Sequence, residues 1–364
     1  MTTDLSAHPG KVLDLANRTR VNAFGVQSAG ESVQPLAITR RPLNLDDVQI
    51  EIEYCGICHS DIHMVNNDWG MSIYPMVPGH EIVGRVLAVG NAVTKFKVGD
   101  SVGVGCLVDA CGDCPSCANH LEQYCLNGFT LTYGSETPAD GITYGGYSTQ
   151  IVVKESFVLR VPESLDRQSV APLLCAGITT YSPLKHWNIQ PGDVVGVIGL
   201  GGLGHMGIQF AHAMGAKVVM ITTSESKGRD AKLLGADEVL LSKDEAAMKS
   251  WAGTFDFLLN TIPVGHDINP YMALLKVDAT MCVVGAIDPL TTGLNTGTMV
   301  FSRRSIAGSL IGGLKETQEM LDFCADHAIG AKVEVIPSGE INTAYTRMQN
   351  NDIKYRFVID LNAK

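Results

Sequence analysis

Four cysteines lie close together in the segment CGDCPSCANHLEQYC. They are Cys111, Cys114, Cys117 and Cys125, and their spacing is C-x2-C-x2-C-x7-C. Thiolate sulfur is a preferred ligand of Zn²⁺, and four sulfurs from one short lobe can complete a tetrahedral shell. A shell closed by protein ligands leaves no position for a substrate. The spacing therefore predicts a structural zinc site.

A second set of metal-ligating residue types is scattered along the chain. It consists of Cys58, the consecutive residues His80 and Glu81, and Cys175. These residues are too far apart to form one local lobe, and they supply too few sulfurs to close a structural site. We therefore predict a second, open metal site with one position left for water or a substrate oxygen.

A glycine-rich loop follows an expected strand, GDVVGVIGL, and precedes an expected helix, HMGIQFAHAMG. The loop contains Gly199, Gly201, Gly202, Leu203 and Gly204 in a G-x-G-x-x-G string. In this context Gly199 makes the turn, Gly201 admits a pyrophosphate, and Gly204 lets helix and strand pack closely. The pyrophosphate would lie on free amides at the helix N-terminus. A turn without a ligand is the alternative, and the regular strand–helix alternation that follows argues against it.

The end of the next expected strand, AKVVMITT, bears on the choice of cofactor. An NAD-type site places an acidic residue there, about 20 residues after the loop, to bind the ribose 2′-hydroxyl. This chain has Thr223 and Ser224 instead, followed by Lys227. Hydroxyls and cations suit a 2′-phosphate, which a carboxylate would repel, so we predict NADP(H). Glu225 is a carboxylate near this position and argues against NADP(H), but we expect its side chain to face solvent.

The elements that must position these residues change in type along the chain. From Val21 to about Val161 short β-branched runs are broken by glycine, which favours a barrel-like β domain. From Pro191 onward expected strands alternate with amphipathic helices, which predicts a parallel sheet wound with helices. PYMALLKV is expected to be helical, and IKYRFVIDL is expected to be a strand that returns to the first domain.

Length and composition set further limits. The chain has 364 residues, 45% of them hydrophobic, which is more than one core usually supports, so two domains are expected. A net charge of −11 without a block of lysine or arginine argues against a nucleic-acid partner. No apolar run approaches the roughly 20 residues that span a bilayer. The N-terminal segment lacks a signal-peptide core, and we expect a polar arm there.

The ten cysteines fit a reducing cytoplasm, because C-x2-C clusters beside a nucleotide-binding pattern indicate metal ligands. Four belong to the clustered site and two to the open site. We expect most of the remaining four to pack as small buried side chains. These are Cys55, Cys106, Cys282 and Cys324.

Taken together, the chain resembles the zinc-type medium-chain alcohol dehydrogenases, and more narrowly the cinnamyl alcohol dehydrogenase group with its bacterial NADPH-dependent aldehyde reductases. The resemblance rests on CGICHSDIH, YPMVPGHEIVG, the four-cysteine lobe, PLLCAGITTY, GLGGLGHMG and YRFVID. It implies a GroES-like β-barrel catalytic domain and a Rossmann domain with a doubly wound parallel sheet. The expected boundaries are 1–185, with the lobe at 106–130, then 186–324 for the Rossmann domain and 325–364 for the return to the catalytic domain.

The resemblance assigns Cys58, His80 and Cys175 as ligands of a catalytic zinc. It makes Glu81 a further carboxylate able to reach the metal, and a supporting carboxylate or buried ion pair is the equal alternative. Asp61 is expected to accept a hydrogen bond from the His80 ring, with a turn-capping role as the alternative.

Ser60 and His63 are implied as a proton relay, since the substrate oxygen must gain a proton when an aldehyde is reduced. An ordinary, partly exposed histidine is the alternative for His63. Further cofactor contacts are implied at five positions. They are His59, Thr179, Val284, Ser309 and Arg356. The alternative for His59 is an ordinary surface histidine, and the alternative for Arg356 is an ion pair within a strand.

The substrate pocket implied by the resemblance is apolar, which suits an aromatic or medium aliphatic aldehyde. The chain departs from phenylpropenol enzymes because LNGFTLTYG, after the last lobe cysteine, lacks their tryptophan. The departure argues against strict cinnamyl specificity. The implied pocket residues are Trp69, Met71, Cys106, Leu310 and Ile311.

We therefore predict a zinc-dependent alcohol dehydrogenase or aldehyde reductase with two Zn²⁺ per chain. It would transfer hydride between NADP(H) and a primary alcohol or aldehyde, with zinc polarising the carbonyl. A polyol or other secondary-alcohol dehydrogenase of the same superfamily is disfavoured by Thr223 and the apolar pocket. A non-catalytic, zinc-stabilised nucleotide-binding protein is disfavoured because the open-site ligands are retained. The resemblance also implies a homodimer.

Overall fold

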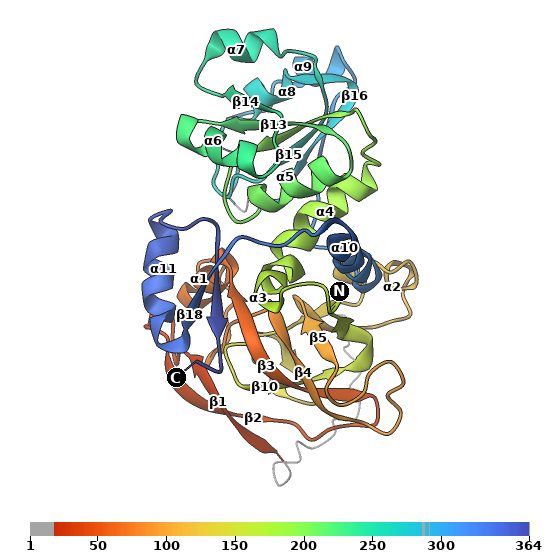
Figure 1. The fold of residues 1–364 in the computed structure, drawn as a ribbon, viewed down its shortest axis with the longest axis vertical. Coiled ribbons are helices and arrows are strands. Elements are labelled where there is room, and N and C mark those ends of the chain that lie inside the picture. The colour runs from red at the N-terminus through yellow and green to blue at the C-terminus, as the bar shows by residue number, and fades with distance from the viewer. Residues whose placement is uncertain (1–17, 286–287, 291, 364) are drawn as a thin grey trace, which may run out of the picture. The chain divides into compact units, whose positions relative to one another are not determined.

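The computed structural model describes residues 18–285, 288–290 and 292–363 (Figure 1). The chain forms two compact units. The first unit runs to Glu163 and also includes residues 334–353 and the tail from Phe357. The second unit comprises Ser164–Val333 and residues 354–356. The polar arm expected at the N-terminus lies outside the described residues, and the predicted domain boundaries stay a prediction.

The first unit is built mainly from antiparallel strands. Its main sheet has the order β11-β5-β4-β3-β19-β18, and β10 also pairs with β3. The strands are β1 (Thr19–Gly25), β2 (Gln34–Arg40), β3 (Asp47–Ile57), β4 (Ile82–Val89), β5 (Ser101–Val104), β6 (Leu107–Ala110), β7 (Phe129–Leu131), β8 (Glu136–Thr137), β9 (Gly141–Ile142), β10 (Gln150–Lys154), β11 (Leu159–Arg160), β18 (Val333–Pro337) and β19 (Arg356–Asp360). Its helices are α1 (His59–Asn66), α2 (Pro115–Ala118) and α11 (Ile341–Gln349), with 3-10 turns at Glu122–Tyr124, Glu155–Phe157 and Ser338–Glu340.

The strand β3 shows why this unit places chemistry where it does. In its first half Ile50 and Ile52 are buried while Glu51 between them is exposed, which is the alternation of a strand with one face on a core. Its last residues, 55–57, are all buried, and the chain passes from them directly into α1. The neighbouring strand β4 begins immediately after His80 and Glu81. The end of β3 and the start of β4 therefore carry predicted metal ligands.

The second unit is a parallel sheet with the strand order β14-β13-β12-β15-β16-β17. This is the doubly wound order in which a dinucleotide binds at the carboxyl ends of the strands. Figure 1 shows α5 and α6 on one side of these strands and α8 and α9 on the other. The strands are β12 (Val194–Ile198), β13 (Lys217–Thr222), β14 (Glu238–Leu241), β15 (Phe255–Asn260), β16 (Leu275–Val283) and β17 (Ser305–Gly308). The helices are α3 (Arg167–Val170), α4 (Ala176–His186), α5 (Gly204–Ala213), α6 (Glu225–Leu233), α7 (Glu245–Ser250), α8 (Asn269–Met272), α9 (Thr296–Val300) and α10 (Leu314–His327), with a 3-10 turn at Ala171–Leu174.

The predicted fold class is confirmed, because an antiparallel β unit is joined to a doubly wound parallel unit. The expectation that PYMALLKV is helical is wrong for its second half. The helix α8 ends at Met272, and Leu275 already pairs with Phe255 in the sheet. A short apolar run does not distinguish a helix from a buried strand, and here the pairing of Leu275 with β15 decides the outcome.

Among the four cysteines outside the predicted metal sites, Cys55, Cys282 and Cys324 are fully buried, as expected, whereas Cys106 is partly exposed. In the described part of the chain, no helix combines the length and apolar character needed to cross a membrane.

Candidate metal and cofactor sites

The four-cysteine lobe brings its sulfurs to one point in the first unit. All four Sγ atoms lie within 4.8 Å of one another. Cys111 Sγ lies 3.8 Å from Cys117 Sγ and 3.4 Å from Cys125 Sγ, and Cys114 Sγ lies 3.9 Å from Cys125 Sγ. A tetrahedral shell with Zn–S bonds of about 2.3 Å requires sulfur–sulfur distances of about 3.8 Å. The lobe is thus already shaped for the metal.

Backbone amides also prepare the lobe for a cation. The amide of Cys114 donates to Cys111 Sγ over 3.4 Å, and the amide of Leu126 donates to Cys114 Sγ over 3.4 Å. Hydrogen bonds from the amides of Cys117 and Leu126 lower the pKa of Cys114 to about 6. Because Zn²⁺ binds the thiolate, these amides favour the ligating form.

The open site begins where β3 and β4 run side by side. Cys55 pairs with Ile82 across the two strands, and the amide of Gly56 donates to the carbonyl of Glu81 over 2.9 Å. This register places the N-cap residue of α1, Cys58, beside the residues that precede β4. The ligand atoms of Cys58, His80 and Glu81 consequently lie within 4.8 Å of one another.

Asp61 organises these residues from behind. It is fully buried, and its Oδ2 accepts the amide of Cys58 over 2.9 Å. Its Oδ1 accepts the amide of Gly79 over 3.1 Å and lies 3.2 Å from His80 Nδ1. A histidine that gives Nδ1–H to a carboxylate keeps Nε2 for a metal. The hydroxyl of Tyr147 also donates to Asp61, over 3.3 Å.

The donor set of the first unit fits a catalytic zinc, since one thiolate, one imidazole and one carboxylate are ligand types that zinc accepts. The fourth predicted residue, Cys175, belongs to the second unit, where it is largely buried at the N-terminus of α4. Thr179 lies one turn along that helix, with its amide bound to the carbonyl of Cys175 over 3.0 Å. The assignment of Cys175 to the zinc stays a prediction.

The predicted relay residues lie on α1. Ser60 Oγ is 3.6 Å from Cys58 Sγ, so the hydroxyl lies at the open site. The His63 side chain is 35% exposed and reaches solvent, and its Nδ1 lies 2.8 Å from Asp68 Oδ2. Its ring stacks on Trp69 with centroids 5.2 Å apart.

Asp68 was not identified from the sequence, although its place five residues after His63, just beyond a helix end, is a usable signal. Of the other predicted residues of the first unit, His59 and Met71 are exposed and Cys106 is partly exposed.

The glycine loop joins β12 to α5 in the second unit, and its glycines serve different purposes. Gly199 has φ +93°, a conformation that favours glycine, and a Cβ at Gly204 would lie 2.0 Å from the carbonyl oxygen of Gly199. At Gly201, by contrast, an added Cβ would meet no described atom within 4 Å. The protein itself does not require glycine at Gly201. The missing side chain there therefore suits the close approach of a ligand.

Arg356 covers the same loop from β19. A Cβ added at Gly202 would lie 2.9 Å from Arg356 Cδ, so the arginine packs directly on the glycine. The preceding Tyr355 stacks on His205 with ring centroids 5.0 Å apart. His205 and Tyr355 were not identified from the sequence, because nothing local links the start of α5 to the tail. A cation on the loop suits a pyrophosphate ligand.

The residues that follow β13 include the predicted contacts to a 2′-phosphate, which stay a prediction. Thr223 and Lys227 are exposed, and Glu225 is exposed as expected. Ser224 has a structural role as N-cap of α6, because its Oγ accepts the amide of Lys227 over 3.5 Å, and it also bonds Ser226 Oγ over 2.8 Å.

The remaining predicted residues follow the last two strands of the sheet. Val284 follows β16, and Ser309 follows β17 and donates its amide to the carbonyl of Val283 over 3.3 Å. Leu310 is exposed and Ile311 is partly buried. All four residues therefore lie at the carboxyl ends of parallel strands, where dinucleotides and their substrates bind.

The fold and the two cysteine-containing ligand sets define a two-domain, zinc-type dehydrogenase. Residues 44–163 match the family described as alcohol dehydrogenase GroES-like domain, and residues 202–326 match zinc-binding dehydrogenase. The chain is 54% identical to aldehyde reductase YahK of Escherichia coli (strain K12), an alignment that covers 94% of this chain and 98% of the relative. The chain therefore belongs to the zinc-binding alcohol dehydrogenase family.

Two solved structures are similar over nearly the whole chain. Cinnamyl alcohol dehydrogenase SbCAD4 from Sorghum bicolor matches with a TM-score of 0.91 at 43% identity, covering 95% of this chain and 99% of that one. The enzyme CAD from Helicobacter pylori, complexed with NADP(H), matches with a TM-score of 0.88 at 40% identity, covering 94% and 99%.

Proposed function

We propose that this enzyme is an NADPH-dependent aldehyde reductase that acts on aromatic or medium aliphatic aldehydes and also oxidises the corresponding primary alcohols. The observation that carries the proposal is the meeting of Cys58, His80 and Glu81 around the buried carboxylate of Asp61. A structural site would need four closed ligands from one lobe, and the cysteine lobe already supplies that site. The second ligand set is therefore assigned to catalysis.

The catalytic zinc is assigned to Cys58, His80 and Cys175, with Glu81 as the carboxylate within reach. Bound zinc supplies Lewis-acid polarisation of the carbonyl, and bound NADPH supplies the hydride. Cys58, His80 and Glu81 belong to the antiparallel unit, and the dinucleotide loop belongs to the parallel unit.

In aldehyde reduction the protein itself must supply a proton to the substrate oxygen. The substrate oxygen must gain one when the carbonyl is reduced, and the hydroxyl of Ser60 stands at the open site, 3.6 Å from Cys58 Sγ. The ring of His63 is partly exposed to solvent, and its Nδ1 lies 2.8 Å from Asp68 Oδ2, which leaves Nε2 for the relay. Asp68 is thereby assigned the role of orienting His63.

The cofactor assignment rests on exposed hydroxyl and ammonium groups of Thr223 and Lys227 after β13, on Gly201, and on Arg356 over the loop. The related H. pylori structure is complexed with NADP(H), in agreement with this assignment. Replacing Thr223 by Asp puts a negative charge where the 2′-phosphate is expected. We expect NADPH affinity, measured by quenching of protein fluorescence, to fall at least tenfold; unchanged affinity contradicts the assignment.

The function is tested by NADPH oxidation with aromatic, aliphatic and terpenoid aldehydes, and with polyols in the reverse direction. Zinc is measured on the same sample. Cys58→Ala should abolish turnover while NADPH still binds, and Cys324→Ala is the control, because it removes a buried thiol outside both ligand sets. Full turnover in Cys58→Ala, or activity with polyols alone, would contradict the proposal.

We further assign the enzyme to the cytoplasm and expect a homodimer. The support for the first is that the cysteines of the described residues form no disulfide, which suits a reducing compartment. Analytical ultracentrifugation of the zinc-loaded protein tests the second.

A further inference from the structure

Tyrosine hydroxyls surround Asp61 behind the open metal site. Tyr147 donates to Asp61 Oδ2 over 3.3 Å, and Tyr345 donates to the hydroxyl of Tyr147 over 3.4 Å. The ring of Tyr133 lies 5.8 Å from that of His80, centroid to centroid. All these side chains are buried. The carboxylate that orients the histidine is thus connected through hydroxyls to α11, far away in the sequence.

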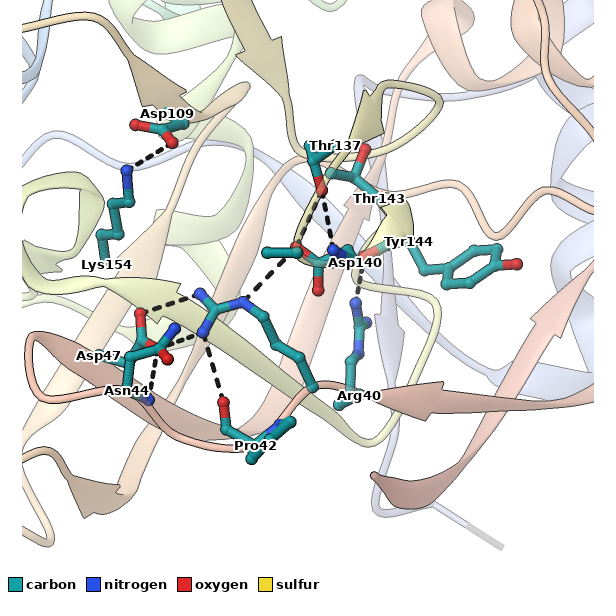
Figure 2. A network of polar contacts seen from close by, with 12 residues as sticks. Arg40, Pro42, Asn44, Asp47, Asp109, Thr137, Asp140, Thr143, Tyr144 and Lys154 are labelled. Atoms are coloured by element: carbon teal, nitrogen blue, oxygen red, sulfur yellow. Dashed lines mark hydrogen bonds and ion pairs between the residues drawn. The ribbon is translucent and has the colours of Figure 1, made fainter. Parts of the chain in front are cut away.

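Hydrogen bonds from two other parts of the chain hold the segment that carries Tyr147. Arg40, which is buried, donates to the carbonyl of Tyr144 over 2.6 Å, as Figure 2 shows, and to the next carbonyl over 2.9 Å. The amides of residues 145–147 donate to carbonyls of residues 77–79, the stretch that leads into the predicted histidine ligand. The tyrosine is therefore held in place by the backbone that also places the ligand.

The hydroxyls of Tyr147 and Tyr345 stay protonated at neutral pH and can therefore donate hydrogen bonds. Burial, together with the negative charge of Asp61, raises the pKa of Tyr147 and of Tyr345 well above its ordinary value. A protonated hydroxyl can give its hydrogen to a carboxylate. Asp61 Oδ2 accepts both the hydroxyl of Tyr147 and the amide of Cys58, and the side chain of Tyr133 also forms a hydrogen bond with Asp61.

We propose that Tyr147, supported by Tyr345, is a positioning residue for the catalytic metal, because its hydroxyl fixes the carboxylate of Asp61, which in turn aims His80 and the amide of Cys58. The inference rests on the proposed function, since it assigns a role toward the zinc. Without this donor the carboxylate keeps its hydrogen bonds to the amides of Cys58 and Gly79 and to His80, but it is held less tightly, and the hydrogen bonds to the ligand residues weaken. Changes to such supporting partners typically lower metal affinity about 10–100-fold.

The test is zinc affinity of the full-length protein, measured by competition with a chelator. The lobe zinc serves as an internal reference, because among the described residues the hydroxyl of Tyr147 bonds to Asp61 and Tyr345 and not to a lobe cysteine. We expect Tyr147→Phe to weaken zinc at the open site about tenfold and to leave the lobe zinc unchanged. Tyr345→Phe should have a smaller effect, and the double variant should match Tyr147→Phe, because Tyr345 acts through Tyr147.

Tyr74→Phe is the matched control. Its hydroxyl donates to the carbonyls of Met64 and Val65 on α1 over 3.2 and 2.8 Å, so its loss perturbs the same helix without touching Asp61. Wild-type affinity in Tyr147→Phe, or an equal loss in Tyr74→Phe, overturns the inference while leaving the proposed function intact. A wild-type protein that holds the lobe zinc alone overturns both.

Discussion

His205 is expected to make the stability of the second unit fall in mild acid. The residue is fully buried at the start of α5, with Nδ1 3.2 Å from the carbonyl oxygen of Gly201. In the described part of the chain its Nε2 has no hydrogen-bond partner. Burial, followed by the charge of Arg356, lowers the pKa of His205 from 6.5 to about 3. The folded protein therefore keeps the ring neutral at a pH where the unfolded chain binds a proton.

The magnitude follows from proton linkage. The stabilisation is fully present above pH 6.5, the ordinary pKa, and is lost progressively as the pH falls toward 3, the folded-state pKa. At about pH 5 the unfolded state gains about 2 kcal/mol relative to the folded state, and the limit, reached only below the folded-state pKa, is about 5 kcal/mol. For a unit of this size, 2 kcal/mol corresponds to roughly 4–8 °C in Tm.

The assay compares Tm at about pH 7.5 and pH 5 for the wild type and for His205→Asn, whose amide stays neutral. The wild type should lose roughly 4–8 °C more than the variant between the two pH values. His327→Asn is the control, since His327 is exposed on α10 and stacks on Phe323. Parallel Tm–pH curves for wild type and His205→Asn would refute the reasoning.

Three further outcomes are expected. Gly201→Ala should leave Tm nearly unchanged but weaken NADPH binding, because its Cβ meets no described atom; fluorescence titration and thermal melting check this, and a large loss of Tm contradicts it. Gly204→Ala should cost about 2–3 kcal/mol of stability by thermal melting, because its Cβ would lie 2.0 Å from a backbone oxygen, and a wild-type Tm would show that the turn yields. Cys117→Ser should halve the zinc content and lower Tm without changing the NADPH affinity, as elemental analysis and binding assays can establish; retention of all the zinc would exclude the lobe as a metal site.

The parts that were predicted well are local in the chain. The four lobe cysteines lie within one short segment, so their spacing alone limits them to a common centre. The glycine loop is likewise local, and the strand before it and the helix after it were recognisable from their own residues. The prediction for the second half of PYMALLKV failed for the opposite reason, since a distant partner in β15, Phe255, decided its conformation.

By itself, the sequence determined the two-domain class, the closed cysteine site and the dinucleotide loop, because each of these depends on neighbours in the chain. For the open metal site it gave only the residue types, which are scattered along the chain. Only the tertiary structure decided how those residues are supported. The pairing of Cys55 with Ile82 sets Cys58 beside His80, and Tyr147 reaches Asp61 across 86 residues of chain. Strand register and burial bring such partners together. The spacing of residues within one segment does not predict which distant side chain will pack beside it.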